Sequence, residues 1–293
     1  MSDSGATLRG KIASATDLQA MARTMKTVAA ANIGQYDSAV VALDRYVDVV
    51  QDCLAACLRT QAWRAVARAD PAGSAGPIGA VVFGSDQGLV GQFNDTIFAR
   101  ALKGAEAAAG LAVVWPVGER VALALADGGA RLGPAFALPS GIAAVGALVG
   151  QLLVEIEASR ERGEIAQVLL FHHRPAGGAA YEPTCTRLLP LDSAWERALL
   201  ARPWPTKARP DVLPPGPSTL AACIREYLFV SLYRACAQSL ASENAARLVA
   251  MQRAEKNIGE LLQQLTQDFH RVRQGSIDEE LFDLIAGFEA QRK

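Results

Sequence analysis

The segment of residues 84–91 has the composition of a phosphate-binding loop. It reads Gly-Ser-Asp-Gln-Gly-Leu-Val-Gly and follows an apolar run at residues 78–83 that predicts a strand. Backbone N–H groups in such loops can cradle phosphates. The loop lacks the Gly-Lys-Ser/Thr ending of a nucleotide P-loop and the Gly-x-Gly-x-x-Gly order of a dinucleotide site. We therefore interpret it as a tight strand-to-helix connection, and we expect no bound cofactor.

Histidine and cysteine, the other residues that could do chemistry, are not spaced for catalysis or metal binding. His172 and His173 are adjacent, so on a strand they point to opposite faces and cannot share a metal ion. The five cysteines lack a zinc-type spacing and are expected to be ordinary buried thiols of a reducing compartment: Cys53, Cys57, Cys185, Cys223 and Cys236. The first two are four residues apart in a helical stretch and should share a helix face. The sequence predicts no catalytic residue and no metal site.

Composition excludes several classes of protein. Of the 293 residues, 51% are hydrophobic and 20% are charged, which argues against disorder and allows a sizeable core. The formal net charge of −1 argues against a nucleic-acid binder. The N-terminus has no apolar signal core, and the most apolar run, residues 142–156, is short and contains Gln151 and Glu155. We expect a soluble chain without direct insertion into a bilayer, whose membrane association would go through partners.

The N-terminal 60 residues predict a long helical rod. Steps of four and three from Leu8 to Gln61 meet sixteen positions, of which thirteen are apolar, and the stretch contains no proline. A 3.5-residue repeat held over this length imposes a left-handed supercoil with a partner helix. At about 1.5 Å per residue the helix would reach roughly 80 Å, which is more than a compact domain of this size needs.

The middle of the chain predicts a small α/β domain. Linker residues rich in proline and glycine occupy 70–77, and apolar runs that predict strands then alternate with helical stretches. The expected strands are residues 78–83, 112–117 and 168–172, and the expected helices are residues 94–109 and 143–161. Such alternation favours a parallel sheet. Residues 202–217 hold six of the fourteen prolines and should be irregular.

The C-terminal part predicts a second rod. From Ala241 to Val272, positions at spacings of three and four are apolar in eight of ten cases, and the apolar stripe resumes after Gly275. Two rods at opposite ends of a chain can pair only if the chain turns back, so we predict an antiparallel coiled coil with an α/β domain inserted. The expected division is a helix at 1–69, the domain at 77–200, a connector at 201–217 and a helix at 218–293.

Three blocks of sequence resemble the γ subunits of bacterial F-type ATP synthases. Residues 8–14 and 22–30 are similar to the family's N-terminal helix, and residues 83–94 are similar to its Asp-Arg-Gly-Leu-Cys-Gly-Gly-x-Asn segment. Residues 239–251 give the strongest likeness, which continues through Asn257 and 273–277 to Glu280. The blocks occur in the family's order at both ends and in the middle, so the resemblance covers nearly the whole chain.

The departures mark a divergent member. Val90 and Gln92 stand where the family usually has Cys and Gly, and Asp278 replaces a usual Thr. A proline-rich segment at 213–217 stands where the family commonly has a Tyr-containing foot.

The resemblance implies a non-catalytic rotor with a long antiparallel coiled coil and a Rossmann-like domain. It implies assembly with three α and three β subunits, the ε subunit and the membrane c-ring, with catalysis on β. The expected location is the cytoplasmic face of the bacterial inner membrane. Rotation would bias each β subunit between open and closed states, coupling ion flow to ATP synthesis or hydrolysis.

The resemblance also implies which residues of the N-terminal helix contact β. Met25 resembles the family's methionine that faces a lever of β, and it lies between the cations Arg23 and Lys26. Residues 1–36 carry four basic and two acidic side chains, whereas residues 37–60 carry two basic and four acidic ones. The basic part would face acidic levers of β. A plain apolar coiled-coil contact is the alternative role for Met25.

On the C-terminal helix, the resemblance implies four further contacts with β. Arg247 resembles an arginine of the partner helix, and Arg273 and Gln274 resemble a pair that meets a loop of β. Glu280, in the last matched block, belongs to the same group. Two rival classes remain: a Rossmann-type enzyme would need the missing cofactor loop, and a free coiled-coil scaffold would need no α/β insert.

Overall fold

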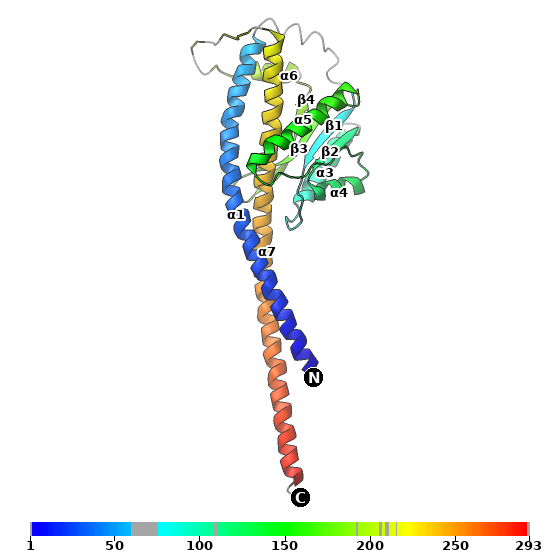
Figure 1. Cartoon of the computed structure of the whole chain (residues 1–293), viewed down its shortest axis with the longest axis vertical. Helices are drawn as coiled ribbons and strands as arrows, with labels where there is room; N and C mark the ends of the chain where they lie inside the picture. The colour runs from blue at the N-terminus through cyan, green and yellow to red at the C-terminus, as the bar shows by residue number, and fades with distance from the viewer. Residues whose placement is uncertain are drawn as a thin grey trace. The chain divides into compact units, whose positions relative to one another are not determined.

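The computed structural model describes residues 2–59, 76–107, 110–191, 193–204, 207–208, 211–214 and 216–291. The chain divides into two compact units: residues 1–29 with 247–293, and residues 30–246. We call these the end unit and the central unit. Two long helices, α1 (Ser2–Leu58) and α7 (Pro217–Gln291), contribute to both units (Figure 1). Residues 60–69 of the predicted N-terminal rod lie outside the described residues.

The predicted apolar stripe of α1 is the buried stripe of the structure. All fifteen of its positions from Leu8 to Cys57 are buried or half-buried, and the same holds for the ten predicted positions of α7 from Ala241 to Val272. Small side chains line the stripe in the end unit, where Ala15, Ala22 and Ala29 are buried. Alanines at these positions let two helices approach closely.

Side-chain contacts show that α1 and α7 run antiparallel in each unit. In the end unit, Arg9 stacks on Phe269 and Arg23 pairs with Glu255. In the central unit, the contacts join three further pairs: Asn32 with Asn244, Tyr46 with Glu226, and Cys57 with Cys223. Residue numbers rise along α1 as they fall along α7, which is the predicted antiparallel pairing.

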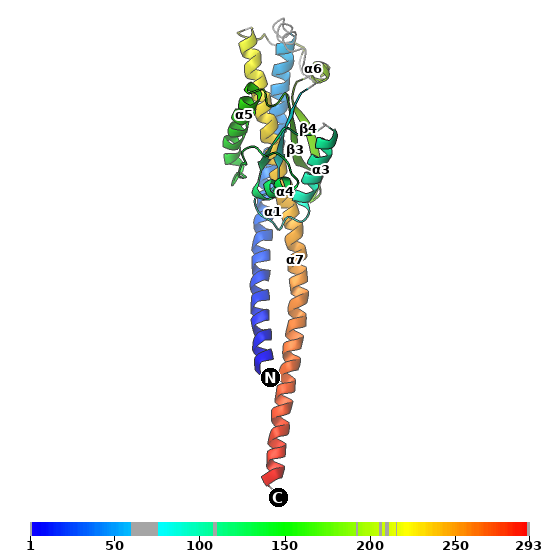
Figure 2. The ribbon, with the colours of Figure 1, turned by 90° about the vertical axis from the view of Figure 1, so that its right-hand side faces the viewer.

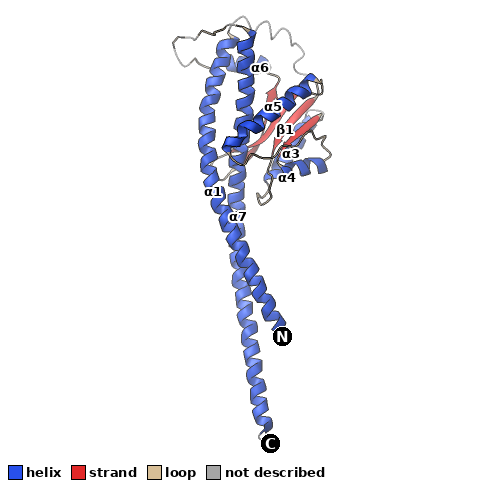
Figure 3. Cartoon of the chain, viewed as in Figure 1, coloured by secondary structure: helices blue, strands red, loops and turns tan. Residues whose placement is uncertain are grey.

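The central unit contains a four-stranded sheet in the order β2-β1-β3-β4. Figure 3 shows the strands of this sheet in red. Strands β1 (Ile78–Phe83), β2 (Val113–Val117) and β3 (Gln167–Pro175) are parallel and match the three predicted strands. The three predicted strands are parallel as expected, but the sheet is mixed, because a fourth strand that was not predicted, β4 (Tyr181–Leu189), is antiparallel to β3. The sequence did not reveal β4 because it is a partly exposed edge strand with Pro183 inside it.

Helices cover both faces of the sheet (Figure 2). On one face, Ala80 and Val82 of β1 pack with α3 (Phe93–Ala107) and α4 (Glu119–Asp127). On the other face, Val81 and Phe83 pack with α5 (Val145–Glu161) and with the first part of α7. Successive residues of a strand point to opposite faces, so a fully apolar strand such as β1 is explained by burial on both sides.

Three shorter elements were not predicted: α4, the 3-10 turn η1 (Ile142–Ala144) and α6 (Ser193–Leu200). The stretch Ile142–Glu161 is long and apolar enough to cross a membrane by length and composition. Six residues of α5 are nevertheless buried in the central unit, as in the core helix of a globular domain. The described residues of the proline-rich connector are irregular as predicted, except that Pro217 begins α7, where its missing N–H is tolerated.

Candidate functional site

The polar groups of Ser85, in the glycine-containing loop between β1 and α3, form hydrogen bonds with the loop itself and with the start of α3. The N–H of Ser85 donates to Oδ1 of Asn94 (3.0 Å), and Nδ2 of Asn94 donates back to Oγ of Ser85 (2.8 Å). The hydroxyl of Ser85, which is fully buried, donates to the carbonyl of Gln87. The loop is therefore the strand-to-helix connection that the sequence predicts.

Asp86 fixes this loop to two other segments. Its carboxylate accepts hydrogen bonds from the N–H of Glu119 at the start of α4 (3.0 Å) and from the N–H of Leu138 (3.1 Å). Close backbone approach makes glycine necessary nearby. A Cβ atom added to Gly84 would lie 2.3 Å from Cβ of Val121. Gly118 has a φ of +113°, which favours glycine, and a Cβ atom added there would lie 2.9 Å from the backbone of Ser85.

His172 and His173 point to opposite faces of β3, as predicted. Nε2 of His172 is 3.0 Å from Oε1 of Gln238 on α7, whereas Nε2 of His173 is 3.0 Å from Oγ1 of Thr96 on α3. The His173 ring also packs on the Phe93 ring, with 4.1 Å between the ring centroids, and contacts the Tyr181 ring edge-on, with 5.0 Å between the centroids. Burial lowers the pKa of His172 to about 4 and that of His173 to about 3, so both imidazoles are neutral at pH 7.

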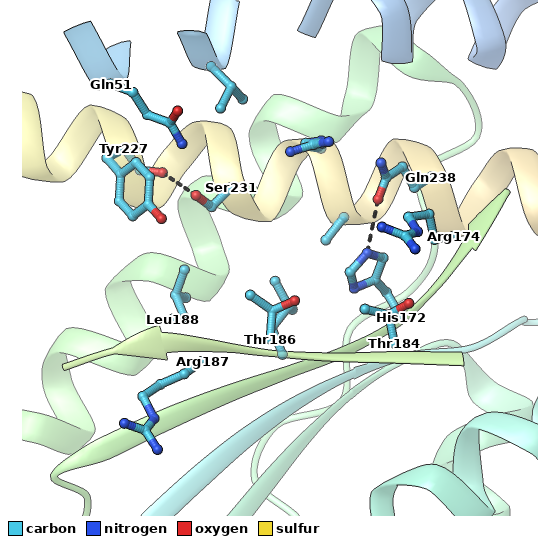
Figure 4. Close-up of a pocket in the computed structure, with 14 residues that line it drawn as sticks. Gln51, His172, Arg174, Thr184, Thr186, Arg187, Leu188, Tyr227, Ser231 and Gln238 are labelled. Carbon is cyan, nitrogen blue, oxygen red and sulfur yellow. Dashed lines mark hydrogen bonds between the residues drawn. The ribbon is translucent and has the colours of Figure 1, made fainter. Parts of the chain in front are cut away.

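A polar pocket of about 170 Å³ lies within the central unit, between the helices and the sheet (Figure 4). His172, Thr184 and Arg187 line it from the sheet, and Gln51 of α1 and Gln238 of α7 line it from the helices. Ser231 on α7 donates to the Tyr227 carbonyl at 2.6 Å. The hydrogen bond between His172 and Gln238, drawn dashed in Figure 4, joins β3 to α7 at this pocket.

In the end unit, two of the residues implied to contact β form an ion-pair cluster with Glu255. Nε of Arg23 lies 2.7 Å from Oε1 of Glu255, and Nζ of Lys26 lies 2.5 Å from Oε2. Hydrogen bonds from Lys26 and Arg23 lower the pKa of the Glu255 carboxyl. The Arg23 side chain remains 60% exposed, so it can still meet a partner while it pairs with Glu255. The sequence pattern gave no sign of Glu255 as the counter-ion.

The neighbouring surface of α1 is apolar. Met25 is half-buried, and Leu18, Met21 and Val28 are exposed at 56%, 63% and 54%. These four residues follow steps of three and four, so they form a second stripe, distinct from the stripe that packs on α7. We call this second stripe the outer stripe. An exposed apolar row of this kind is typical of a surface that another protein covers.

The structure places the four implied positions of α7 along its end-unit part. Arg247 is half-buried, whereas Arg273, Gln274 and Glu280 are exposed. Arg273 lines a groove with Arg9 and Phe269, and the Arg9 guanidinium lies 5.4 Å from the Phe269 ring centre. The seven implied residues therefore all belong to the end unit, and among the ion pairs described here Glu255 brings Arg23 and Lys26 together.

Beyond Arg273 the surface of α7 becomes strongly apolar and acidic. Ile277, Leu281, Phe282, Leu284 and Ile285 are exposed at 53%, 54%, 68%, 64% and 47%. Acidic side chains at positions 278, 279, 280 and 283 interrupt them. The apolar pattern after Gly275 predicts that part of this stripe belongs to the coiled coil. Its exposure shows that α1 does not cover it.

A family model described as ATP synthase matches residues 4–291, which is nearly the whole chain. The chain belongs to the γ subunit family of ATP synthases. A curated relative, the ATP synthase gamma chain of Polynucleobacter necessarius subsp. necessarius, is 32% identical over 145 residues. That match covers 49% of this chain and 48% of the relative, so it spans about half the length of the curated protein.

Solved structures show the same fold. The rotor of the Euglena gracilis mitochondrial ATP synthase matches 94% of this chain and all of its own, with a TM-score of 0.65 at 17% identity. A second Euglena gracilis structure, of OSCP, F1 and the c-ring, matches 99% of this chain and 95% of its own with a TM-score of 0.69 at 16% identity. The central stalk and c-ring of Tetrahymena thermophila gives a TM-score of 0.58 at 21% identity, covering 80% of this chain and 99% of its own. These likenesses show that the chain shares its fold with the three solved structures.

Proposed function

We propose that this chain is the central-stalk rotor subunit of an F-type ATP synthase and that it couples ion flow to ATP synthesis or hydrolysis by rotation. The observation that carries the proposal is the family match over residues 4–291, together with end-unit helices that expose two apolar surfaces. One is the outer stripe of α1, and the other is the apolar and acidic end of α7. A chain that acted alone would gain nothing from exposing these rows to water.

The surfaces of the end unit suit an asymmetric shaft. The outer stripe lies beside the cations Arg23 and Lys26, whereas the end of α7 carries acidic residues. As the shaft turns, a partner that stays in place would contact first one of these surfaces and then the other. Contact free energies that differ between two states of a partner shift its equilibrium between them. The chain would therefore bias the β subunits without contributing an active site of its own.

We propose that the partners are three α and three β subunits, the ε subunit and the membrane c-ring. Arg23, Met25 and Lys26 would contact β from α1, and four positions would contact β from α7: Arg247, Arg273, Gln274 and Glu280. The complex would lie at the cytoplasmic face of a bacterial inner membrane. The regions would be a helix at 1–69, an α/β domain at 77–200, a connector at 201–217 and a helix at 218–293, and the chain would need no cofactor.

Reconstitution tests this function directly. The full chain is mixed with α and β subunits, and the products are separated by size and assayed for ATP hydrolysis. We expect one stable complex that contains this chain and hydrolyses ATP, while the purified chain alone hydrolyses none. A chain that hydrolyses ATP alone, or that fails to join α and β under conditions where a known γ subunit joins them, would refute the proposal.

The matched variant changes only the exposed apolar end of α7. Ile277→Ser combined with Leu281→Ser alters two residues that are more than half exposed, so the chain should fold normally. We expect weaker assembly with α and β and an unchanged circular dichroism spectrum. Unchanged assembly would show that this surface is not the one the partners cover.

A further inference from the structure

Two cysteines from the two long helices meet in the central unit. Sγ of Cys57 lies 3.8 Å from Sγ of Cys223. Cys57 is next to the last residue of α1, and Cys223 is in the second turn of α7. Both belong to an apolar cluster in which Leu54, Leu58 and Leu220 are buried. The expectation of buried thiols holds for Cys57 and Cys236 but is wrong for Cys53, which is exposed. Cys57 and Cys223 are far apart in the sequence but adjacent in the structure.

The two sulfur atoms of this pair are near enough to touch but are not bonded. A disulfide bond needs a sulfur separation of about 2.05 Å, and side-chain rotation of two thiols already in contact can supply the difference. All five cysteines are reduced in the structure. Cys57 is buried, whereas Cys223 is half-buried and so can meet a small reagent. Cys53, one turn before Cys57, is exposed and provides a built-in comparison.

We propose that Cys57 and Cys223 are a thiol-oxidation site at which a small disulfide oxidant, such as oxidised glutathione, joins α1 to α7 reversibly. In the first step, the Cys223 thiolate attacks one sulfur of the oxidant, the oxidant's S–S bond breaks, and one glutathione thiol leaves. In the second step, the Cys57 thiolate attacks Sγ of Cys223, and the second glutathione thiol leaves. Two cysteine thiols are oxidised, one oxidant disulfide is reduced, and the two released protons end on the two glutathione thiols.

The surroundings of Cys57 set the order of these steps. Burial, and to a smaller extent the neighbouring Cys223, raise the pKa of the Cys57 thiol to about 12. Little thiolate is then present on Cys57 near neutral pH, so its attack is the slower step. A mixed disulfide on Cys223 should therefore appear before the internal bond.

The bond would close a long loop. The residues between Cys57 and Cys223 include the whole sheet, so the cross-link removes many conformations from the unfolded chain. The oxidised chain should resist heat better than the reduced chain. A reductant should reverse the effect, because the bond forms by exchange.

The test exposes the full chain to oxidised glutathione and maps its disulfides by mass spectrometry of peptides. We expect a peptide pair that joins Cys57 to Cys223, faster migration on a non-reducing gel, and a thermal midpoint raised by several degrees. Cys57→Ala and Cys223→Ala should each abolish all three effects, whereas Cys53→Ala should leave them intact. Circular dichroism of each variant checks that its helices are retained.

Three results would overturn the proposal. One is a disulfide that includes Cys53, Cys185 or Cys236 in place of the named pair. Another is glutathione that stays on Cys223 without an internal bond forming. The third is an unmodified chain under conditions that oxidise a reference dithiol. Because the wild-type chain is mapped directly, the conclusion does not depend on whether a variant folds.

Discussion

His172 and His173 are buried on opposite faces of the sheet, and each has one polar partner. Their folded-state pKa values of about 4 and about 3 lie below the ordinary value of 6.5. The unfolded chain therefore binds more protons below pH 6.5, and the stability of the folded state falls as the pH falls. From pH 7 to 5 each histidine should lower the free energy of unfolding by about 2 kcal/mol.

Urea denaturation followed by tryptophan fluorescence at pH 7 and pH 5 measures this loss. Replacing His173 by Phe should reduce the difference between the two pH values by about 2 kcal/mol, because one of the two titrating groups is removed. His270→Asn, at an exposed position of α7, is the matched control and should leave the difference unchanged. Equal differences in the His173 variant and the wild-type chain would contradict the assignment of the acid effect to the buried pair.

Asp86 is the residue that holds the β1–α3 loop to its neighbours. Asp86→Ala leaves the N–H groups of Glu119 and Leu138 without their acceptor, and we expect a loss of about 2–3 kcal/mol in the free energy of unfolding. Asp86→Asn keeps one acceptor oxygen and should lose less. Gln87→Ala, an exposed neighbour, serves as the control in the same denaturation assay. If Asp86→Ala and Gln87→Ala are equally stable, these two hydrogen bonds do not secure the loop.

At the scale of elements, the small residues of the α1 stripe set how closely the helices pack. Ala29 is 1% exposed, whereas its neighbour Ala30 is exposed. Ala29→Leu adds volume to a packed position and should destabilise the chain by about 1–3 kcal/mol. Ala30→Leu adds the same volume to the surface and should change stability little. Thermal unfolding by circular dichroism compares the two, and equal midpoints would show that Ala29 is not tightly packed.

The elements also show which structure could be predicted from the sequence. The α1 stripe was predictable because its 3.5-residue apolar repeat continues over many helical turns, and strands β1 to β3 were predictable because each contains a run of apolar residues. Strand β4 was not, because its pairing with β3 is a long-range contact and Pro183 weakens the local pattern. The pairing of Glu255 with Arg23 and Lys26 depends on how α1 and α7 align, and residue spacing within one helix does not give that register. The same limit applies to the approach of Cys57 to Cys223.

At the scale of the whole molecule, Met25 tests the proposed coupling to β. Met25→Lys places a third cation beside Arg23 and Lys26. Among the ion pairs described, these two cations share one carboxylate, that of Glu255. The added charge should strengthen attraction to whichever acidic lever of β lies opposite, and so make some rotary positions more stable than others. We expect ATP hydrolysis to persist in membrane vesicles while ion pumping falls disproportionately.

Thr27→Lys, which adds the same charge at an exposed position two residues away, is the control. It should lower pumping less than Met25→Lys does. If hydrolysis and pumping fall by equal proportions in the Met25 variant, or if neither changes, Met25 is only a packing residue of α1.

The central claim is that this chain rotates within its complex, and direct observation of rotation tests it. A bead is attached to the β3–β4 turn through Ala179→Cys, at an exposed position, in a chain that carries Cys53→Ser and Cys223→Ser to remove the exposed and half-buried native thiols of the two helices. The α and β subunits are fixed to a surface and ATP is supplied. We predict continuous rotation of the bead in one direction, with a rate that follows the ATP concentration. A complex that hydrolyses ATP while the bead stays still, or only fluctuates in both directions, would contradict the account.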